Sequence, residues 1–289
     1  MAELAPKAGG GFFGRLAMGL LPVVILSGVW LAALWSADAP RASTEAIAAG
    51  LPWAWLLRGV HFMASTGLIL ATGVHTLLML RRRRERSLPP AVWWRSTLLL
   101  PVVVLAALGG FVMRGDAEAV AAWQVWRGIL ESMPFVGEAL ARLLLGLRSD
   151  DLASDDLGAV ALHHGGTFTL AAWLLSTEHG RRLWPDVRAT VQAAALCLAL
   201  AAVVPLPLSD TSDGATLLLG PWFLLGLQGA LLDLPAAAGW LVPLLAFVAL
   251  GAVRHVQGLA RKALLTLLAG AFALNLMWTL RLLWSMGAA

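Results

Sequence analysis

The chain has 289 residues, of which 59% are hydrophobic and only 13% charged, with a formal net charge of +4 at pH 7. This balance excludes an ordinary soluble domain, and several continuous apolar runs are long enough to span a bilayer as helices rather than as barrel strands. The basic residues cluster beside these runs, so the positive charge does not indicate a nucleic-acid partner.

Seven membrane-spanning helices are predicted in chain order. They cover residues 15–36, 54–80, 96–113, 159–178, 190–208, 237–254 and 262–285. The first run is too long for the apolar part of a signal peptide, so we interpret it as a retained span. The single cysteine, Cys197, excludes an internal disulfide and is interpreted as a small buried apolar residue. The predicted fold class is therefore all-α, a polytopic transmembrane helical bundle.

The charges are distributed asymmetrically between the connections. The basic side carries Lys7, Arg15, Arg81, Arg82, Arg83, Arg84, Arg86, Arg181, Arg182, Arg188, Arg254, Arg261 and Lys262. The opposite side carries Asp116, Glu118, Glu131, Glu138, Asp150, Asp151, Asp155, Asp156, Asp210, Asp213 and Asp233. Because basic residues stay on the cytoplasmic side of a membrane, the N-terminus is predicted to be cytoplasmic.

The long connection 114–156 is predicted to be structured. Its 119–147 portion has apolar residues at helical spacing, and Pro134 and Gly137 divide it into two parts. We expect a helical hairpin lying on the outer membrane surface.

Two pairs of histidines lie within the predicted spans. His61 and His75 are 14 residues apart in the second span, and His164 and His179 are 15 apart in the fourth. At a rise of about 1.5 Å and a turn of about 100° per residue, each pair covers about 21–22 Å and stays broadly on one helix face. If the two helices run antiparallel, the pairs meet at two levels. That arrangement suits two stacked haems, each ligated by one imidazole from each helix.

His163 competes with His164 as the fourth-span ligand, since only one of two adjacent residues can point inward. A spacing of 15 from His164 keeps the shared face, whereas 16 from His163 turns about 160°. We choose His164 and give His163 a supporting or loop-facing role. For each histidine the alternative is a helix–helix hydrogen bond, and for His179 it is an interfacial position at a helix end.

Four segments resemble the cytochrome b family of quinol-oxidising cytochrome bc and bf complexes. They are RGVHFMAS at 58–65, the glycine pair Gly14 and Gly28, the stretch 109–138 that ends in MPFVGE, and GPWFLLGLQGALLDLP at 220–235. The last two are similar to the family's IPFIGE-type segment and to a PxWYFLGLQELL segment of some bacterial members. The resemblance covers about residues 12–255. It implies a di-haem four-helix domain over residues 1–188 and a three-helix domain like subunit IV over 189–289.

The resemblance also implies roles for residues around the histidines. Arg58, one turn before His61, is similar to an arginine that pairs with a haem propionate; the alternative is an interfacial arginine that reaches the membrane surface. Small residues that let haem faces approach the backbone are expected at Gly14, Gly28, Gly110 and Ser96. Ordinary packing of small residues between helices is the alternative for these positions.

The family pattern fails at the outer quinol site. The family's PWDQ reads Arg-Gly-Asp-Ala at 114–117, and the PEWY segment, with its glutamate, reads Gly-Pro-Trp-Phe at 220–223. The fourth-helix arginine is replaced by Ala159. Quinol oxidation needs a proton acceptor. Asp116 is a weak candidate for that catalytic role, and a solvated loop carboxylate is the alternative that we prefer.

These features predict a di-haem cytochrome b subunit that carries electrons across the bacterial cytoplasmic membrane. The resemblance implies two b-type haems as cofactors. It also implies a quinone or quinol and membrane lipid as small-molecule partners. It further implies a Rieske-type iron–sulfur protein, a c-type cytochrome or both in a multi-subunit complex. The family is usually dimeric, but the sequence leaves the oligomeric state of this protein open. Whether the chain catalyses quinol oxidation is left open. One alternative is a di-haem anchor of another oxidoreductase without quinol bifurcation, and another is a haem-free structural subunit or transporter.

Overall fold

The computed structural model describes residues 11–146, 154–180, 186–208 and 218–287. Every regular element within these ranges is a helix, which confirms the predicted all-α membrane bundle. Several charged residues used to predict the topology lie outside the described residues, namely Lys7, Asp150, Asp151, Arg181, Arg182, Asp210 and Asp213.

Four helices in the described part of the chain are long and apolar enough to cross a membrane. They are α1 (Phe12–Ala32), α3 (Ala54–Arg81), α4 (Pro90–Val112) and α12 (Gly258–Gly287). The predicted spans 190–208 and 237–254 form the shorter apolar helices α9 (Val187–Val203) and α11 (Ala238–Ala252). The number of seven spans therefore stays a prediction.

The fourth predicted span is not one regular helix. It consists of α7 (Ser154–Leu162), a π-helical turn η3 (His163–Phe168) and α8 (Thr169–Gly180). The turn contains Gly165 and Gly166, at which an added Cβ would meet at most one atom in the described part of the chain. Because glycine is conformationally permissive, these two residues can adopt the π-helical turn, which is wider than an α-helical turn.

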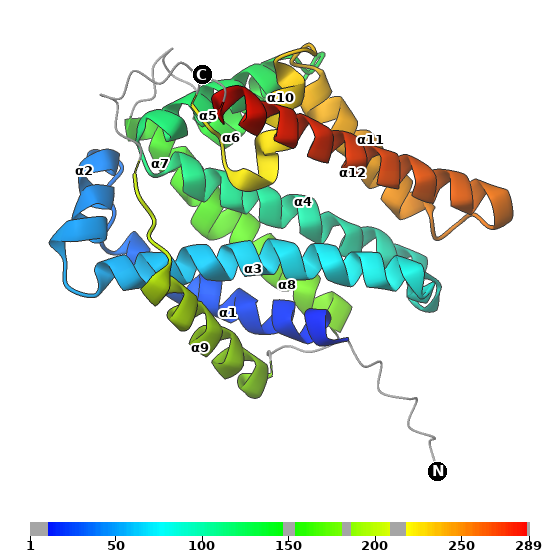
Figure 1. The fold of residues 1–289 in the computed structure, drawn as a ribbon, viewed down its shortest axis with the longest axis horizontal. Helices are drawn as coiled ribbons and strands as arrows, with labels where there is room; N and C mark the ends of the chain where they lie inside the picture. Colours follow the sequence, from blue (N-terminus) through cyan, green and yellow to red (C-terminus); the bar gives the residue numbers. More distant parts are fainter. Residues whose placement is uncertain (1–10, 147–153, 181–185, 209–217, 288–289) are drawn as a thin grey trace.

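Helices α1, α3, α4 and α8 run side by side along the long axis of the molecule, and α9 lies against α1 and α3 (Figure 1). Their shared core contains Leu20, Leu21, Leu68, Val103 and Ala193. Helix α9 lies close to α3 at Gly59. A Cβ added to this glycine would lie 2.8 Å from the Cβ of Ala201. The helix that would open the predicted second domain thus packs on the first, and the division after residue 188 stays a prediction.

A helical hairpin lies at one end of the bundle, as predicted. Its helices are α5 (Ala117–Glu131) and α6 (Gly137–Leu145). Trp123, Trp126 and Leu145 pack with Val112 of α4 and Val160 of α7. Below we name this the hairpin end. At the opposite end, α3 and α4 are joined through η2 (Arg84–Ser87), and we name it the basic end.

Two short helices at the hairpin end were not predicted from the sequence. They are α2 (Pro40–Glu45) and the π-helical turn η1 (Ala46–Gly50), which connect α1 to α3. The start of α2 contacts the turn after α4 at Gly115, where φ is +68° and a Cβ would lie 2.8 Å from the Arg41 nitrogen. Only glycine suits that backbone conformation and that spacing.

The C-terminal helices α10 (Leu225–Leu231), α11 and α12 pack together, and α11 lies against α4 and α5 (Figure 1). α10 and the preceding η5 (Trp222–Leu224) were not predicted as helices. The C-terminal group is tied to the basic end by a buried ion pair between Arg261 and Glu85, 2.9 Å apart. It is also tied by a hydrogen bond from Trp93 Nε1 to the Gly251 carbonyl.

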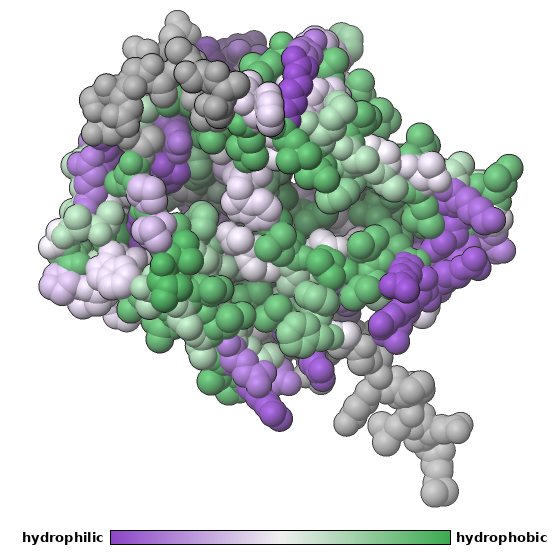
Figure 2. Space-filling model, in the orientation of Figure 1, coloured by the Kyte–Doolittle hydropathy of each residue, from purple (hydrophilic) through white to green (hydrophobic). Residues whose placement is uncertain are grey.

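Apolar residues form a broad band across the middle of the face drawn in Figure 2, and hydrophilic residues gather towards its margins. The exposed apolar side chains include Leu26, Leu70, Leu77, Leu170 and Phe272. Such a continuous apolar surface is unfavourable in water and matches the hydrocarbon core of a bilayer.

Candidate functional site

The structure brings the four span histidines together as two pairs. The rings of His61 and His164 have centroids 6.1 Å apart, and their planes cross at 72°. The rings of His75 and His179 have centroids 5.8 Å apart, and their planes cross at 80°. The first pair lies toward the hairpin end and the second toward the basic end. Helix α3 and the continuous segment η3–α8 therefore present imidazoles to each other at two levels, about 21 Å apart by the rise of a helix.

The π-helical turn explains how two different spacings produce matching levels. His61 and His75 are 14 residues apart in a regular helix, whereas His164 and His179 are 15 apart across η3. A π-helical turn takes up one residue more than an α-helical turn. The second pair therefore stays on one face as a spacing of 14 would in a regular helix. The prediction from the sequence assumed a regular α-helix and therefore omitted the extra residue of this turn.

Backbone carbonyls orient the hairpin-end pair. His164 Nδ1 lies 2.7 Å from the Ala106 carbonyl oxygen of α4, and His61 Nδ1 lies 3.1 Å from that of Val24. A carbonyl oxygen only accepts, so Nδ1 carries the proton in both rings and Nε2 keeps its lone pair. Ser27 supports His61 as well, with its Oγ 3.0 Å from Nδ1. The sequence analysis missed Ser27, although it directly precedes Gly28.

A serine orients His179 in the basic-end pair. Ser96 Oγ lies 2.8 Å from His179 Nδ1 and donates its own hydrogen to the Val92 carbonyl at 2.7 Å. The hydroxyl can then only accept from the ring, so Nδ1 carries the proton in His179 too. This arrangement is common for histidines that bind a metal through Nε2.

Glycines of α1 and α4 make room for the imidazoles of His61, His75 and His164. A Cβ added to Gly14 would lie 2.8 Å from Cε1 of His75, and one added to Gly28 would lie 3.0 Å from Cε1 of His61. A Cβ added to Gly110 would lie 2.8 Å from Cε1 of His164. With Ser96 beside His179, each imidazole meets one small residue of α1 or α4. The small positions expected from the sequence are thus brought to the four rings.

His163 points away from the pairs. Its Nε2 lies 2.7 Å from the Leu143 carbonyl of α6, and its Nδ1 lies 3.1 Å from Thr167 Oγ1. These contacts tie the π-helical turn to the hairpin. The loop-facing position expected for His163 is where the structure places it.

Asp116 is buried, which contradicts the expectation of a solvated loop carboxylate. Its Oδ1 accepts a hydrogen bond from the Ala119 N–H at 3.0 Å and so caps the start of α5. Its other oxygen is paired with Arg114. These contacts give Asp116 a structural role.

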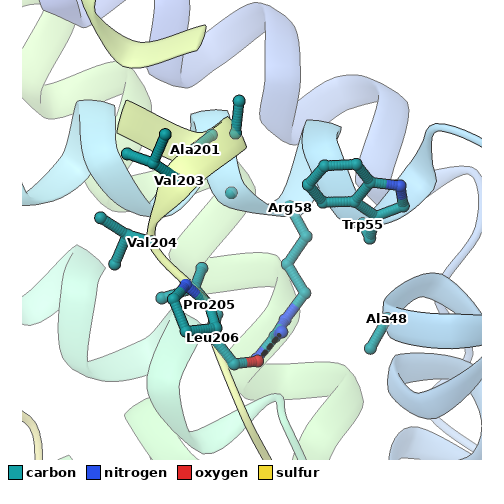
Figure 3. A pocket seen from close by; sticks show the side chains of 10 residues that line it. Ala48, Trp55, Arg58, Ala201, Val203, Val204, Pro205 and Leu206 are labelled. Atoms are coloured by element: carbon teal, nitrogen blue, oxygen red, sulfur yellow. Dashed lines mark hydrogen bonds between the residues drawn. The ribbon is translucent and has the colours of Figure 1, made fainter. Parts of the chain in front are cut away.

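Arg58 faces a cavity at the hairpin end, with a volume of about 340 Å³ (Figure 3). Its guanidinium donates to the Leu206 carbonyl at 2.6 Å, and Trp55 and Ala48 line the other side of the cavity. The segment that follows α9 thus holds the arginine one turn from His61. The charges of Arg114 and Asp116 also act on Arg58, so these groups are close in space.

The segment 220–223, which stands in place of the family's PEWY, is held by Gln228. Its amide accepts from Gly220 N–H at 2.8 Å and donates to the Leu218 carbonyl at 2.7 Å. Gln228 therefore closes a loop. No acidic residue occurs between residues 218 and 232.

Comparison with protein families matches residues 10–163 to the family described as Cytochrome b/b6/petB. The chain belongs to the cytochrome b family. The matched segment includes α1, α3, α4 and the hairpin, and it reaches the start of η3. As a cytochrome b, the protein is a membrane electron-transfer protein that binds b-type haem.

The fold of this cytochrome b is also found among solved structures. A chain of "Hyperthermophilic respiratory Complex III" superposes with a TM-score of 0.63 and is 15% identical in sequence. The match covers 95% of this chain and 85% of the other. At this identity the likeness concerns the fold. No curated protein matches the chain in sequence.

The residues of this cytochrome b fit a haem. Two metal–nitrogen bonds of about 2 Å, and about 1 Å from each nitrogen to its ring centre, put ligating imidazole centres about 6 Å apart. Both observed pairs have this separation. Each pair supplies two imidazole nitrogens, and so it suits an iron whose other ligands come from a macrocycle.

Proposed function

We propose that this cytochrome b binds two b-type haems, one between His61 and His164 and one between His75 and His179. The observation that carries the proposal is the pair of imidazole contacts at two levels, each beside a small residue of α1 or α4. Bound haem supplies reversible one-electron chemistry. The four imidazoles would hold the two haem irons, contacts on α1 and α4 fix the tautomers of His61, His164 and His179, and apolar helices surround the pairs.

The two levels suggest the direction of electron movement. The hairpin-end pair and the basic-end pair lie about 21 Å apart along α3, which is most of a bilayer's hydrocarbon thickness of about 30 Å. Electrons passing between the pairs would cross the membrane. We assign the basic end to the cytoplasm of a bacterium, because Arg81–Arg86 and Arg254–Lys262 gather there, and we place the N-terminus on the same side.

The family membership and the shared fold support a place in a multi-subunit cytochrome bc-type complex. We propose a quinone as the small-molecule partner near the basic-end pair, and a Rieske-type iron–sulfur protein or c-type cytochrome at the hairpin end. The acidic residues of the hairpin end favour a basic protein surface there.

A second candidate is a di-haem electron conduit that does not oxidise quinol at the hairpin end. It is favoured by the described contacts of Asp116, the weak candidate for the proton acceptor. Asp116 is buried, caps α5 and is paired with Arg114. It is therefore not arranged to take a proton from a bound quinol.

The test is the reduced-minus-oxidised absorbance spectrum and the haem content of the purified protein. Two haems per chain are expected, and His75→Ala should remove one while the hairpin-end haem stays. A spectrum without haem signals, or one unchanged by His75→Ala, would contradict the proposal. Co-purifying subunits and sensitivity to inhibitors of quinol oxidation separate the two candidates. The conduit predicts no iron–sulfur protein and no inhibition.

A further inference from the structure

We propose that Arg114 binds a propionate carboxylate of the haem held by His61 and His164, and so acts with Arg58 as a two-arginine anchor. This inference rests on the proposed function, because it assumes a haem at the hairpin-end pair. It concerns a residue that the sequence analysis noted only as a departure from the family pattern.

The position of Arg114 follows from the helices that hold the imidazoles. Gly110 of α4 contacts the ring of His164, and Arg114 follows it by four residues. The chain stays wound beyond the helix end, since the Arg114 N–H donates to the Phe111 carbonyl at 3.2 Å. One helical turn is about 3.6 residues. Arg114 therefore lies about one turn beyond His164, toward the hairpin end.

Arg58 has the matching position on the neighbouring helix. It precedes His61 by three residues, which again is about one turn toward the hairpin end. Helices α3 and α4 are in contact. Haem is amphiphilic, and its carboxylates avoid the apolar centre of a bilayer. They would point toward this end, where the two guanidiniums lie.

The surroundings of Arg114 orient it and leave one donor without an acceptor. Its guanidinium lies over the Phe111 ring at 4.5 Å and pairs with Asp116 and with Glu118, the latter at 3.0 Å. Its buried Nε has no hydrogen-bond partner within the described residues. A buried N–H without an acceptor is unfavourable, and a carboxylate would satisfy it with a charge-assisted bond.

The positive charges of Arg58 and Arg114 act on each other, and the carboxylates of Asp116 and Glu118 balance them. The buried Nε of Arg114 is therefore the donor that favours a carboxylate here. Ala159, where the resemblance implied an arginine on the fourth helix, offers no positive charge. Arg114 would supply the second guanidinium from α4 instead.

The test is a potentiometric titration of both haems in the purified full-length protein, with His75→Ala used to identify the hairpin-end signal. A nearby positive charge favours the reduced haem. Arg114→Gln should therefore lower the midpoint potential of the hairpin-end haem, and Asp116→Asn, which still caps α5, should raise it. The basic-end haem should not shift. Arg114→Lys, which keeps the charge but loses the planar fork, should produce a smaller decrease.

Arg127→Gln is the matched control. Arg127 also lies near a ring, 5.8 Å from Trp123, and pairs with a glutamate, but it lies on the hairpin helix α5. It should leave both midpoints unchanged. The inference is overturned if two haems are present and Arg114→Gln moves the hairpin-end midpoint no more than Arg127→Gln does. A protein without a hairpin-end haem would instead overturn the proposed function, and this inference with it.

Discussion

Ser96 of α4 and His179 of α8 are joined by a hydrogen bond of 2.8 Å in which the ring nitrogen donates to the serine oxygen. The serine's own hydrogen is directed to the Val92 carbonyl, so its oxygen is left to accept. His164 donates to a carbonyl of the same helix α4, and His61 to one of α1. Three of the four imidazoles are thus oriented by neighbouring helices, with Nε2 left to bind a metal.

Replacing this acceptor should weaken one haem only. Ser96→Ala removes the partner of His179 Nδ1, and the loss of such an outer contact typically lowers metal affinity by about 10–100-fold. We expect reduced occupancy of the basic-end haem and normal occupancy of the other, measured by haem titration. Ser65→Ala is the control, because the hydrogen bond that Ser65 makes among the described residues stays within its own helix, to the His61 carbonyl. Equal effects of the two variants would contradict the assignment.

The glycine contacts predict a steric test of the hairpin-end haem. Gly110→Ala places a Cβ 2.8 Å from His164, which must then shift, whereas Gly73→Ala in α3 meets no described atom within 4 Å. Both changes should stabilise the helix by about 1 kcal/mol, so this term cancels between them. Gly110→Ala should lose the hairpin-end haem signal, and Gly73→Ala should keep both. Two unaltered signals in Gly110→Ala would contradict close packing at His164.

The π-helical turn predicts an asymmetry between deletions. Removing Gly165 shortens the spacing from His164 to His179 from 15 to 14, which a regular α-helix accommodates with the same facing. Removing Gly67 shortens the spacing from His61 to His75 from 14 to 13, which turns the second ring by about 140° from the first. We expect the Gly165 deletion to keep both haems and the Gly67 deletion to lose one. The absorbance spectrum decides this, and loss of haem in the Gly165 deletion would refute the explanation by register.

The buried ion pair at the basic end should contribute strongly to stability. Arg261→Met leaves the fully buried Glu85 carboxylate without its partner, and such losses cost about 3–5 kcal/mol. The thermal midpoint of the purified protein should fall, and the double variant Glu85→Leu with Arg261→Met should recover most of the loss.

The control for this ion pair is Arg281→Met, because the Arg281–Asp233 pair is largely exposed. It should cost less than about 1 kcal/mol. A loss as large as that of Arg261→Met would show that burial is not the cause.

The amino-acid sequence by itself determined the long helices and the fold class. Continuous apolar runs of 18 or more residues predict α1, α3, α4 and α12, because the length needed to cross a bilayer is a local property. The facing of His61 and His75 follows from helical periodicity within a single regular helix. The hairpin was predicted from the same periodicity and from Pro134 and Gly137.

Tertiary structure decided what depends on neighbours distant in the sequence. The π-helical turn, the short helices α2 and α10, and the burial of Asp116 were not predicted, because each is stabilised by packing rather than by local pattern. Which small residue meets which imidazole depends on how α1 and α4 lie beside α3 and α8. Two of the partners of Nδ1 are the backbone carbonyls of Val24 and Ala106; every residue carries a carbonyl, so no sequence pattern could single these two out.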